Sequence, residues 1–175
     1  MTRRVLFVLA IIGLVVALDQ YSKAWAVAAL QHMPTRSHFG GTVLFLYAEN
    51  TGAWGSMGSG LGDVARFWLL TVLPFGFLGG LGFYVVRSNE LKPYMVWSYA
   101  LVIGGGLGNL IDRALYGYVV DFLWMGIPNG LGTNIFNLAD VFIMIGVITL
   151  LVMHMLVERK SPKPDSSESV KSTLV

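Results

Sequence analysis

Four long apolar segments dominate the pattern of hydrophobic and polar positions along the chain. They cover residues 5–18 with a continuation over 24–30, then 67–86, 94–111 and 135–157. Each segment approaches the roughly 20 residues that a helix needs to cross a hydrocarbon core of about 30 Å. The pattern therefore predicts four membrane-spanning helices.

Basic residues flank these segments unevenly. They precede the first segment, separate the second from the third and follow the fourth, at Arg3, Arg4, Arg87, Lys92, Arg159, Lys160, Lys163 and Lys171. Because cytoplasmic loops carry an excess of lysine and arginine, this distribution predicts that both termini and the short middle loop are cytoplasmic. A basic start before an apolar run is also typical of a secretory signal. The membranous chain that follows favours a permanent span.

The two longer connections, about 31–66 and 114–134, are then expected to face outward. Residues 42–47 read TVLFLY, a β-branched and aromatic run that favours a strand. Asn50-Thr51-Gly52 has the composition of a turn. These features predict a small sheet or cradle on the outer membrane surface.

The expected fold is an α-helical membrane protein with four transmembrane helices and a small outward-facing β-cradle. Residues 1–160 are predicted to form a single four-span domain. Residues 161–175 are rich in Ser, Pro and Lys, which predicts a disordered cytoplasmic tail.

Composition narrows the function classes. Hydrophobic residues make up 55% of the chain and charged residues 13%, against about 25% charged in soluble domains, so a membrane protein is expected. The net charge of +2 does not suggest nucleic acid as a partner. The chain has no cysteine, and its three histidines show no metal-binding spacing. We therefore expect no metal and no cofactor.

Two carboxylates are the main candidates for chemistry. Asp121 lies in VVDF just beyond the third apolar segment, and Asp140 lies in FNLAD at the start of the fourth. Ionisable groups at membrane depth are costly and commonly functional. Two carboxylates held together can share a proton and activate a water. The alternative is that Asp140 only complements a helix N-terminus while Asp121 is an ordinary loop residue.

Other polar residues have both structural and functional interpretations. Asp19 and Lys23 are four residues apart on one helix face, which favours a buried structural pair. The string GGGLGNLIDR lets helices approach closely and places Asn109 and Asp112-Arg113 near one packed face. Its alternative is plain glycine packing with Asp112-Arg113 as an interfacial anchor. Asn50 favours a turn role over donation to a peptide carbonyl.

Five strings occur together in a fixed order: DQYSK (19–23), ENTGAWGS (49–56), GGGLGNLIDR (104–113), YVVDF (118–122) and FNLAD (136–140). With this order, its size and four predicted spans, the chain resembles lipoprotein signal peptidase, the type II signal peptidase of bacteria. The resemblance covers roughly residues 5–157.

The resemblance implies a membrane aspartyl endopeptidase that removes the signal peptide of diacylglyceryl-modified prolipoproteins immediately before the lipidated cysteine. It assigns the catalytic pair to Asp121 and Asp140. Further matched motif positions are Asp19, Lys23, Asn50, Gly52, Asn109, Arg113, Asn137 and Ala139. The resemblance also implies an inner-membrane location with the site near the outer face, lipid contacts, cyclic peptide inhibitors of the globomycin type and a monomer. Residues 55–62 are a candidate lid.

Two other functions stay open from the residues alone. A transporter or proton relay would use Asp19, Asp112, Asp121 and Asp140 to line a pathway. The outward clustering of these carboxylates weakens that reading, since it leaves the cytoplasmic half without a polar path. A non-catalytic assembly protein would pack through its glycines and tolerate asparagine at both candidate aspartates.

Overall fold

The structure, a computed structural model, describes residues 2–53, 57–58, 60–128 and 130–158. The tail predicted to be disordered lies outside the described residues, and so does part of the candidate lid. In chain order the elements are α1 (Thr2–Leu30), β1 (Arg36–His38), η1 (Phe39–Gly41), β2 (Val43–Asn50), α2 (Asp63–Phe67), η3 (Trp68–Val72), α3 (Leu73–Arg87), α4 (Pro93–Tyr116), β3 (Val119–Met125) and α5 (Leu138–Glu158).

The prediction of four spans is confirmed. Within the described residues, four helical stretches are long and apolar enough to cross a membrane: Thr2–Leu30, Asp63–Arg87, Pro93–Tyr116 and Leu138–Leu156. The helical ends differ from the predicted ones by a few residues, because α4 continues through its polar GNLIDR turns and α5 begins only after Asn137. Hydropathy predicts the apolar part of a membrane-spanning helix, but it does not detect polar turns that continue the helix beyond that part.

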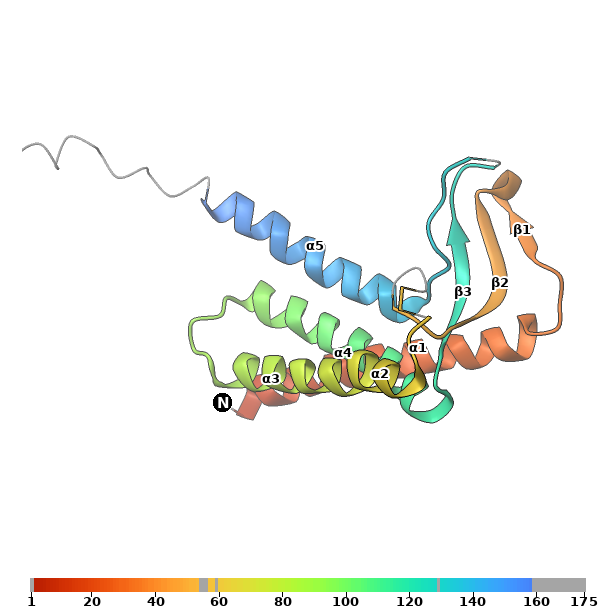
Figure 1. Cartoon of the computed structure of the whole chain (residues 1–175). Helices are drawn as coiled ribbons and strands as arrows, with labels where there is room; N and C mark the ends of the chain where they lie inside the picture. The colour runs from red at the N-terminus through yellow and green to blue at the C-terminus, as the bar shows by residue number, and fades with distance from the viewer. Residues whose placement is uncertain (1, 54–56, 59, 129, 159–175) are drawn as a thin grey trace, which may run out of the picture.

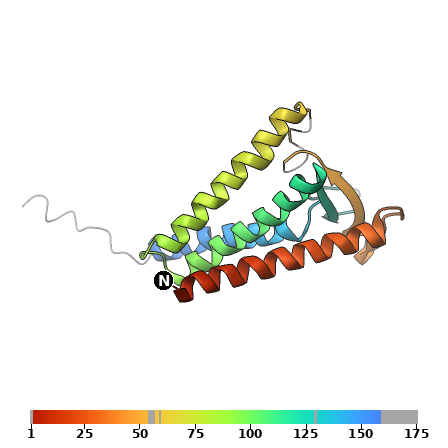
Figure 2. The same ribbon diagram turned by 90° about the horizontal axis from the view of Figure 1, so that it is seen from below.

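Helix α4 packs against α1, α3 and α5 and forms the middle of the bundle (Figure 2). Its glycines allow this close packing, as predicted. A Cβ added at Gly104 would lie 2.8 Å from Cβ of Val15 on α1, and one added at Gly105 would lie 2.5 Å from the carbonyl oxygen of Ala139 on α5. Small residues of this kind let helix backbones approach where the lipid provides no hydrophobic drive.

The second span is interrupted near its start. Pro74, in the first turn of α3, has no backbone N–H, and its ring clashes with a carbonyl one turn earlier in a regular helix. The five residues before α3, Trp68–Val72, form the π-helical turn η3. Figure 2 shows α3 diverging from α4 towards α2. This divergence opens the space between the helices that the site uses.

A three-stranded antiparallel sheet in the order β1-β2-β3 confirms the predicted β-region (Figure 1). One face of the sheet packs on the C-terminal part of α1, through Ala26, Leu30, Val120 and Phe122. The alternative in which Asp121 is an ordinary loop residue is wrong, because Asp121 lies on β3 opposite Ala48 of β2. The apolar run around Asp121 is short and holds a charge, so its strand character depends on pairing with β2.

Candidate active site

Asp121 is held on a buried strand. Helix α4 ends at Tyr116 and is capped by Gly117, whose φ of 79° lies in the left-handed region that glycine adopts without strain. The chain then turns into β3, where Val119, Val120 and Phe122 are also buried. Asp121 itself is only 3% exposed. A carboxylate so far from water needs hydrogen-bond donors from the protein.

Asp140 lies in the first turn of α5 and is half-buried. The Asn137 side-chain oxygen accepts the Asp140 N–H at 3.1 Å, and the Asp140 carboxylate accepts the Asn137 N–H at 3.1 Å. This reciprocal pair is a capping box, in which Asn137 and Asp140 satisfy two N–H groups at the helix start. The helix N-terminus also favours negative charge at Asp140.

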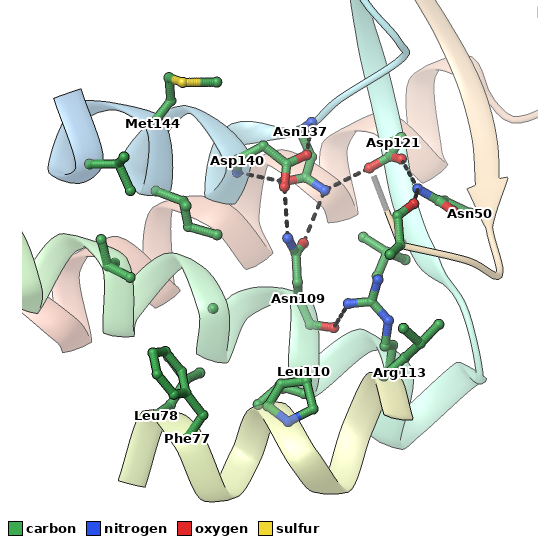
Figure 3. A pocket seen from close by; sticks show the side chains of 18 of the residues that line it. Asn50, Phe77, Leu78, Asn109, Leu110, Arg113, Asp121, Asn137, Asp140 and Met144 are labelled. Carbon is green, nitrogen blue, oxygen red and sulfur yellow. Dashed lines mark hydrogen bonds between the residues drawn. The ribbon is translucent and has the colours of Figure 1, made fainter. Parts of the chain in front are cut away.

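Asn137 joins the two aspartates. Its side-chain N–H₂ donates to Oδ1 of Asp121 at 2.6 Å and to Oδ1 of Asn109 at 3.0 Å. The Asn109 amide in turn donates to Oδ1 of Asp140 at 2.9 Å (Figure 3). Asp121 and Asp140 are therefore linked through two shared amides, although they come from different elements.

Asn50 has the turn role that the sequence favoured and also contacts one of the two candidate aspartates. Its side-chain oxygen accepts the N–H of Gly52 at 3.0 Å, which closes the turn after β2. Its side-chain N–H₂ donates to Oδ2 of Asp121 at 3.0 Å. Arg113 holds the same turn from α4 by donating to the carbonyl of Gly52 at 2.8 Å. The turn is thus fixed against Asp121 (Figure 3).

Burial away from water raises the pKa of Asp121 to about 6. The hydrogen bond from Asn50 opposes this rise because it stabilises the charged carboxylate, whereas the nearby charge of Asp140 adds to it. Asp121 is consequently able to hold a proton in mildly acidic conditions, where an exposed aspartate is ionised.

Asp19 and Lys23 form a buried ion pair of 2.8 Å, and Lys23 also pairs with Asp112 at 3.1 Å. The alternative in which Asp112 is an interfacial anchor is wrong, because Asp112 is 1% exposed. Gln20, which the sequence analysis missed, donates to Asp112 at 2.9 Å. Helical spacing does not predict this contact, because Gln20 is adjacent to Asp19 and adjacent helical residues point in different directions. Gln20 reaches α4 because its side chain is long.

A cavity of about 520 Å³ lies between η3–α3, α4 and α5 and ends at the two aspartates. Asn50, Asn109, Arg113 and Asn137 also line this polar end. The rest of the wall is apolar, with Leu70, Pro74, Phe77, Leu78, Leu110, Ile143, Met144 and Val147 (Figure 3). This volume lies in the range of small-molecule and peptide pockets, about 300–1,000 Å³. The arrangement suits a mainly apolar ligand whose polar part reaches the carboxylates.

The structure brings Asp121, Asp140, Asn50, Asn109, Arg113 and Asn137 to one cavity wall. Ala139 and Gly52 contribute backbone contacts: Ala139 donates its N–H to Asp19 at 2.9 Å, and Gly52 accepts from Arg113. Among the described residues, no group of three or more histidine, aspartate or glutamate side chains could hold a metal ion.

Comparison with known proteins gives consistent matches. Residues 11–157 match the sequence model of the family described as signal peptidase (SPase) II. The chain is 36% identical over 149 residues to a lipoprotein signal peptidase of Xylella fastidiosa, covering 85% of this chain and 88% of the relative. It is 37% identical over 143 residues to the lipoprotein signal peptidase of Syntrophomonas wolfei, covering 82% and 89%.

Solved structures match as well. The chain resembles a bacterial membrane enzyme solved by the in meso method at 2.3 Å resolution, with a TM-score of 0.73 and 26% identity over 90% of this chain and 93% of the other. A second bacterial membrane enzyme, solved by the same method at 1.9 Å resolution, gives a TM-score of 0.70 and 27% identity, covering 84% and 91%.

Proposed function

This chain belongs to the signal peptidase II family, and we propose that it cleaves diacylglyceryl-modified prolipoproteins immediately before the lipidated cysteine, with Asp121 and Asp140 as an aspartyl catalytic pair. The family makes the chain a protease of prolipoprotein signal peptides and, with its apolar helices, a multi-pass protein of the bacterial inner membrane. We propose the aspartyl mechanism, the requirement for a lipid-modified substrate and the orientation of the chain in the membrane.

The observation that supports the mechanism is that both aspartates accept hydrogen bonds from the same residue, Asn137. Asp121 accepts from the Asn137 side chain, and Asp140 accepts from its backbone N–H, at the polar end of an otherwise apolar cavity. Two carboxylates in one site cannot both ionise freely, which favours one shared proton. The raised pKa of Asp121 favours Asp121 as the proton carrier, and the helix N-terminus favours charge on Asp140.

In the proposed reaction a water molecule between the two carboxylates attacks the scissile carbonyl carbon. Asp140 takes a proton from the water as the new C–O bond forms, and Asp121 donates its proton to the carbonyl oxygen. The tetrahedral intermediate then collapses. The C–N bond breaks, the leaving amine takes the proton held by Asp140, and one hydroxyl of the intermediate returns its proton to Asp121 as the C=O bond re-forms. A carboxylic acid and an amine result, and water is the only co-reactant.

The amides around the pair support this division of roles. Asn50 and Asn137 hold Asp121, while Asn109 and Asn137 hold Asp140. Arg113 lines the cavity, and its Nε has no hydrogen-bond partner among the described residues. We assign this N–H to a carbonyl oxygen of the bound peptide.

The apolar wall of the cavity suits the apolar part of a signal peptide and the acyl chains of its lipid. Away from the aspartates, the cavity wall consists of apolar side chains such as Phe77, Val102 and Val147. These side chains offer no polar groups that could bind an ion on its way across the membrane. This favours peptide hydrolysis over transport. The same cavity is the proposed site for cyclic peptide inhibitors of the globomycin type, and the monomer is the proposed active form.

The proposed orientation follows from charge. Arg4 lies near the start of α1, and its guanidinium donates to the carbonyl of Ser88 in the connection between α3 and α4. Asp19 lies 15 residues further along the same helix, about 22 Å at 1.5 Å per residue. Arg4 and the connection between α3 and α4 therefore lie on the proposed cytoplasmic side. The sheet and the start of α5, which carry Asp121 and Asp140, lie at the other end of the bundle, near the proposed outer face (Figure 1).

The test is cleavage of a purified diacylglyceryl-modified precursor by detergent-solubilised protein, followed as a gel shift. Wild type should cleave it, whereas Asp121→Asn and Asp140→Asn should not, because each removes a proton-transfer group. Asp63→Asn is the matched control, since the Asp63 side chain is 97% exposed. Cleavage by either site variant would refute the pair, and no cleavage by folded wild type would refute the peptidase. A precursor without the diacylglyceryl group tests the lipid requirement.

A further inference from the structure

Lys23 lies at the centre of a buried polar cluster behind the two aspartates. Its ammonium contacts Asp19 Oδ2 at 2.8 Å and Asp112 Oδ2 at 3.1 Å, and it donates to Oδ1 of Asn109 at 3.0 Å. The Lys23 side chain is 4% exposed. One cation therefore holds two carboxylates and one amide from α1 and α4, away from water.

Each of those two carboxylates holds the backbone next to one proposed catalytic aspartate. Asp19 accepts the N–H of Ala139, the residue before Asp140, at 2.9 Å. Asp112 accepts the N–H of Val120, the residue before Asp121, at 3.0 Å. The start of α5 and strand β3 are thus fixed to the same ammonium through matching contacts.

Lys23 also contributes to the orientation of the Asn109 amide. An ammonium group only donates hydrogen bonds, so Asn109 must present its oxygen to Lys23. The Asn109 N–H₂ is then turned to Asp140, to which it donates at 2.9 Å. The Asn137 side-chain N–H₂ donates to the same Asn109 oxygen at 3.0 Å, so Lys23 and Asn137 together fix the order of the two ends of the amide.

We propose that Lys23 is a positioning residue of the peptidase site, which sets the spacing between Asp121 and Asp140 by clamping Asp19, Asp112 and Asn109. The proposal rests on the proposed catalytic pair. Among the described residues, Lys23 is not one of those that line the cavity, so it is not placed to contact a ligand bound there. It acts through the backbone N–H groups of Ala139 and Val120 and through the Asn109 amide.

A purely stabilising role explains this cluster less well. Desolvation of buried charges offsets much of their attraction, so buried ion pairs are weak contributors to stability. Here a single cation also holds two carboxylates that repel each other. The contacts are instead directed at the backbone beside each aspartate, which is what accurate placement requires.

The first test variant is Lys23→Met, which keeps the length of the side chain and removes the charge. Displacement of catalytic groups by about 1 Å costs on the order of 100-fold in rate. We expect kcat for the diacylglyceryl-modified precursor to fall about 100-fold with KM within about threefold of wild type. Ser22→Ala is the matched control on the same helix, because the Ser22 hydroxyl donates to the carbonyl of Asp19 one turn earlier, its only hydrogen bond to a described residue.

The pH profile separates positioning from general destabilisation. The positive charge of Lys23 lowers the pKa of Asp121, so its removal should move the basic limb of the kcat profile to higher pH. The other charged groups around this cluster are Asp19 on α1, Asp112 and Arg113 on α4, and Asp140 on α5. They are unchanged in the variant, and a variant that is only partly folded would lose amplitude without this shift.

Asp112→Asn is the second variant, in case Lys23→Met does not fold. It keeps an oxygen for the N–H of Val120 but removes the charge that Lys23 clamps. We expect folded protein with kcat reduced at least tenfold, whereas Asp63→Asn stays at wild-type kcat. Wild-type kcat in folded Lys23→Met, or in folded Asp112→Asn if Lys23→Met does not fold, overturns the proposal. Asp140→Asn run in parallel tells the two hypotheses apart, because cleavage by Asp140→Asn refutes the catalytic pair itself.

Discussion

Gly105→Ala tests whether the close contact between α4 and α5 sets the place of Asp140. A Cβ at this position would lie 2.5 Å from the carbonyl oxygen of Ala139 and 2.8 Å from Cγ1 of Ile143. The Ile143 side chain can rotate, but a backbone carbonyl cannot. To restore ordinary contact, α5 must move away by roughly 1 Å at the residue that precedes Asp140.

The expected effect on stability is small, because two contributions oppose each other. Replacement of glycine by alanine inside a helix favours folding by about 1 kcal/mol. Overpacking in a dense interior costs about 1–3 kcal/mol. The net destabilisation should therefore lie between about zero and 2 kcal/mol, and the protein should remain folded at room temperature.

The expected effect on activity is larger. A shift of roughly 1 Å in Asp140 moves it relative to Asp121, and such misplacement costs about 100-fold in rate. That factor corresponds to about 2.7 kcal/mol of lost transition-state stabilisation. The loss of transition-state stabilisation should consequently exceed the loss in the free energy of unfolding, because catalysis is more sensitive than packing to a shift of about 1 Å.

The assay is kcat/KM for precursor cleavage, measured together with the thermal unfolding midpoint in the same detergent. Gly79→Ala on α3 is the matched control, because within the described residues nothing beyond the backbone of its own helix lies within 4 Å of its new Cβ. It should keep wild-type activity within about threefold and gain slightly in stability. If folded Gly105→Ala cleaves within threefold of wild type, the contact does not determine the position of Asp140.

Three further predictions concern the pair and the cavity. The cleavage rate of wild type should decline as pH rises through about 6, because Asp121 then gives up its proton. Asn50→Ala removes a hydrogen bond that stabilises the Asp121 carboxylate, so it should move this decline in the pH–rate profile to higher pH. Asn137→Ala should reduce kcat at least 100-fold in the cleavage assay, because it removes the side chain that holds Asp121. Loss of the helix cap should lower the free energy of unfolding by about 1 kcal/mol, measured by thermal unfolding. A wild-type kcat would contradict the role of this amide in positioning the aspartates. Met144→Trp should raise KM severalfold by filling the cavity, whereas Ile145→Trp, at a neighbouring exposed position that does not line it, should leave KM near wild type in the same assay.

The spans and the family were predictable from the sequence because both depend on local signals. An apolar segment of about 20 residues specifies a membrane helix by its length and composition alone. The five ordered strings indicated the signal peptidase II family, to which the matching of residues 11–157 assigns the chain. The same strings named Asp121 and Asp140 as candidates, while their catalytic role stays a prediction.

The tertiary structure decided how these residues meet. The link between Asp121 and Asn137 joins residues 16 apart, that between Asn109 and Asp140 joins residues 31 apart, and that between Asp19 and Ala139 spans 120 residues. No periodicity in the chain encodes such contacts, since helical spacing relates only residues within a few turns. They exist because β3 pairs with β2 and because glycines bring α4 against α1 and α5.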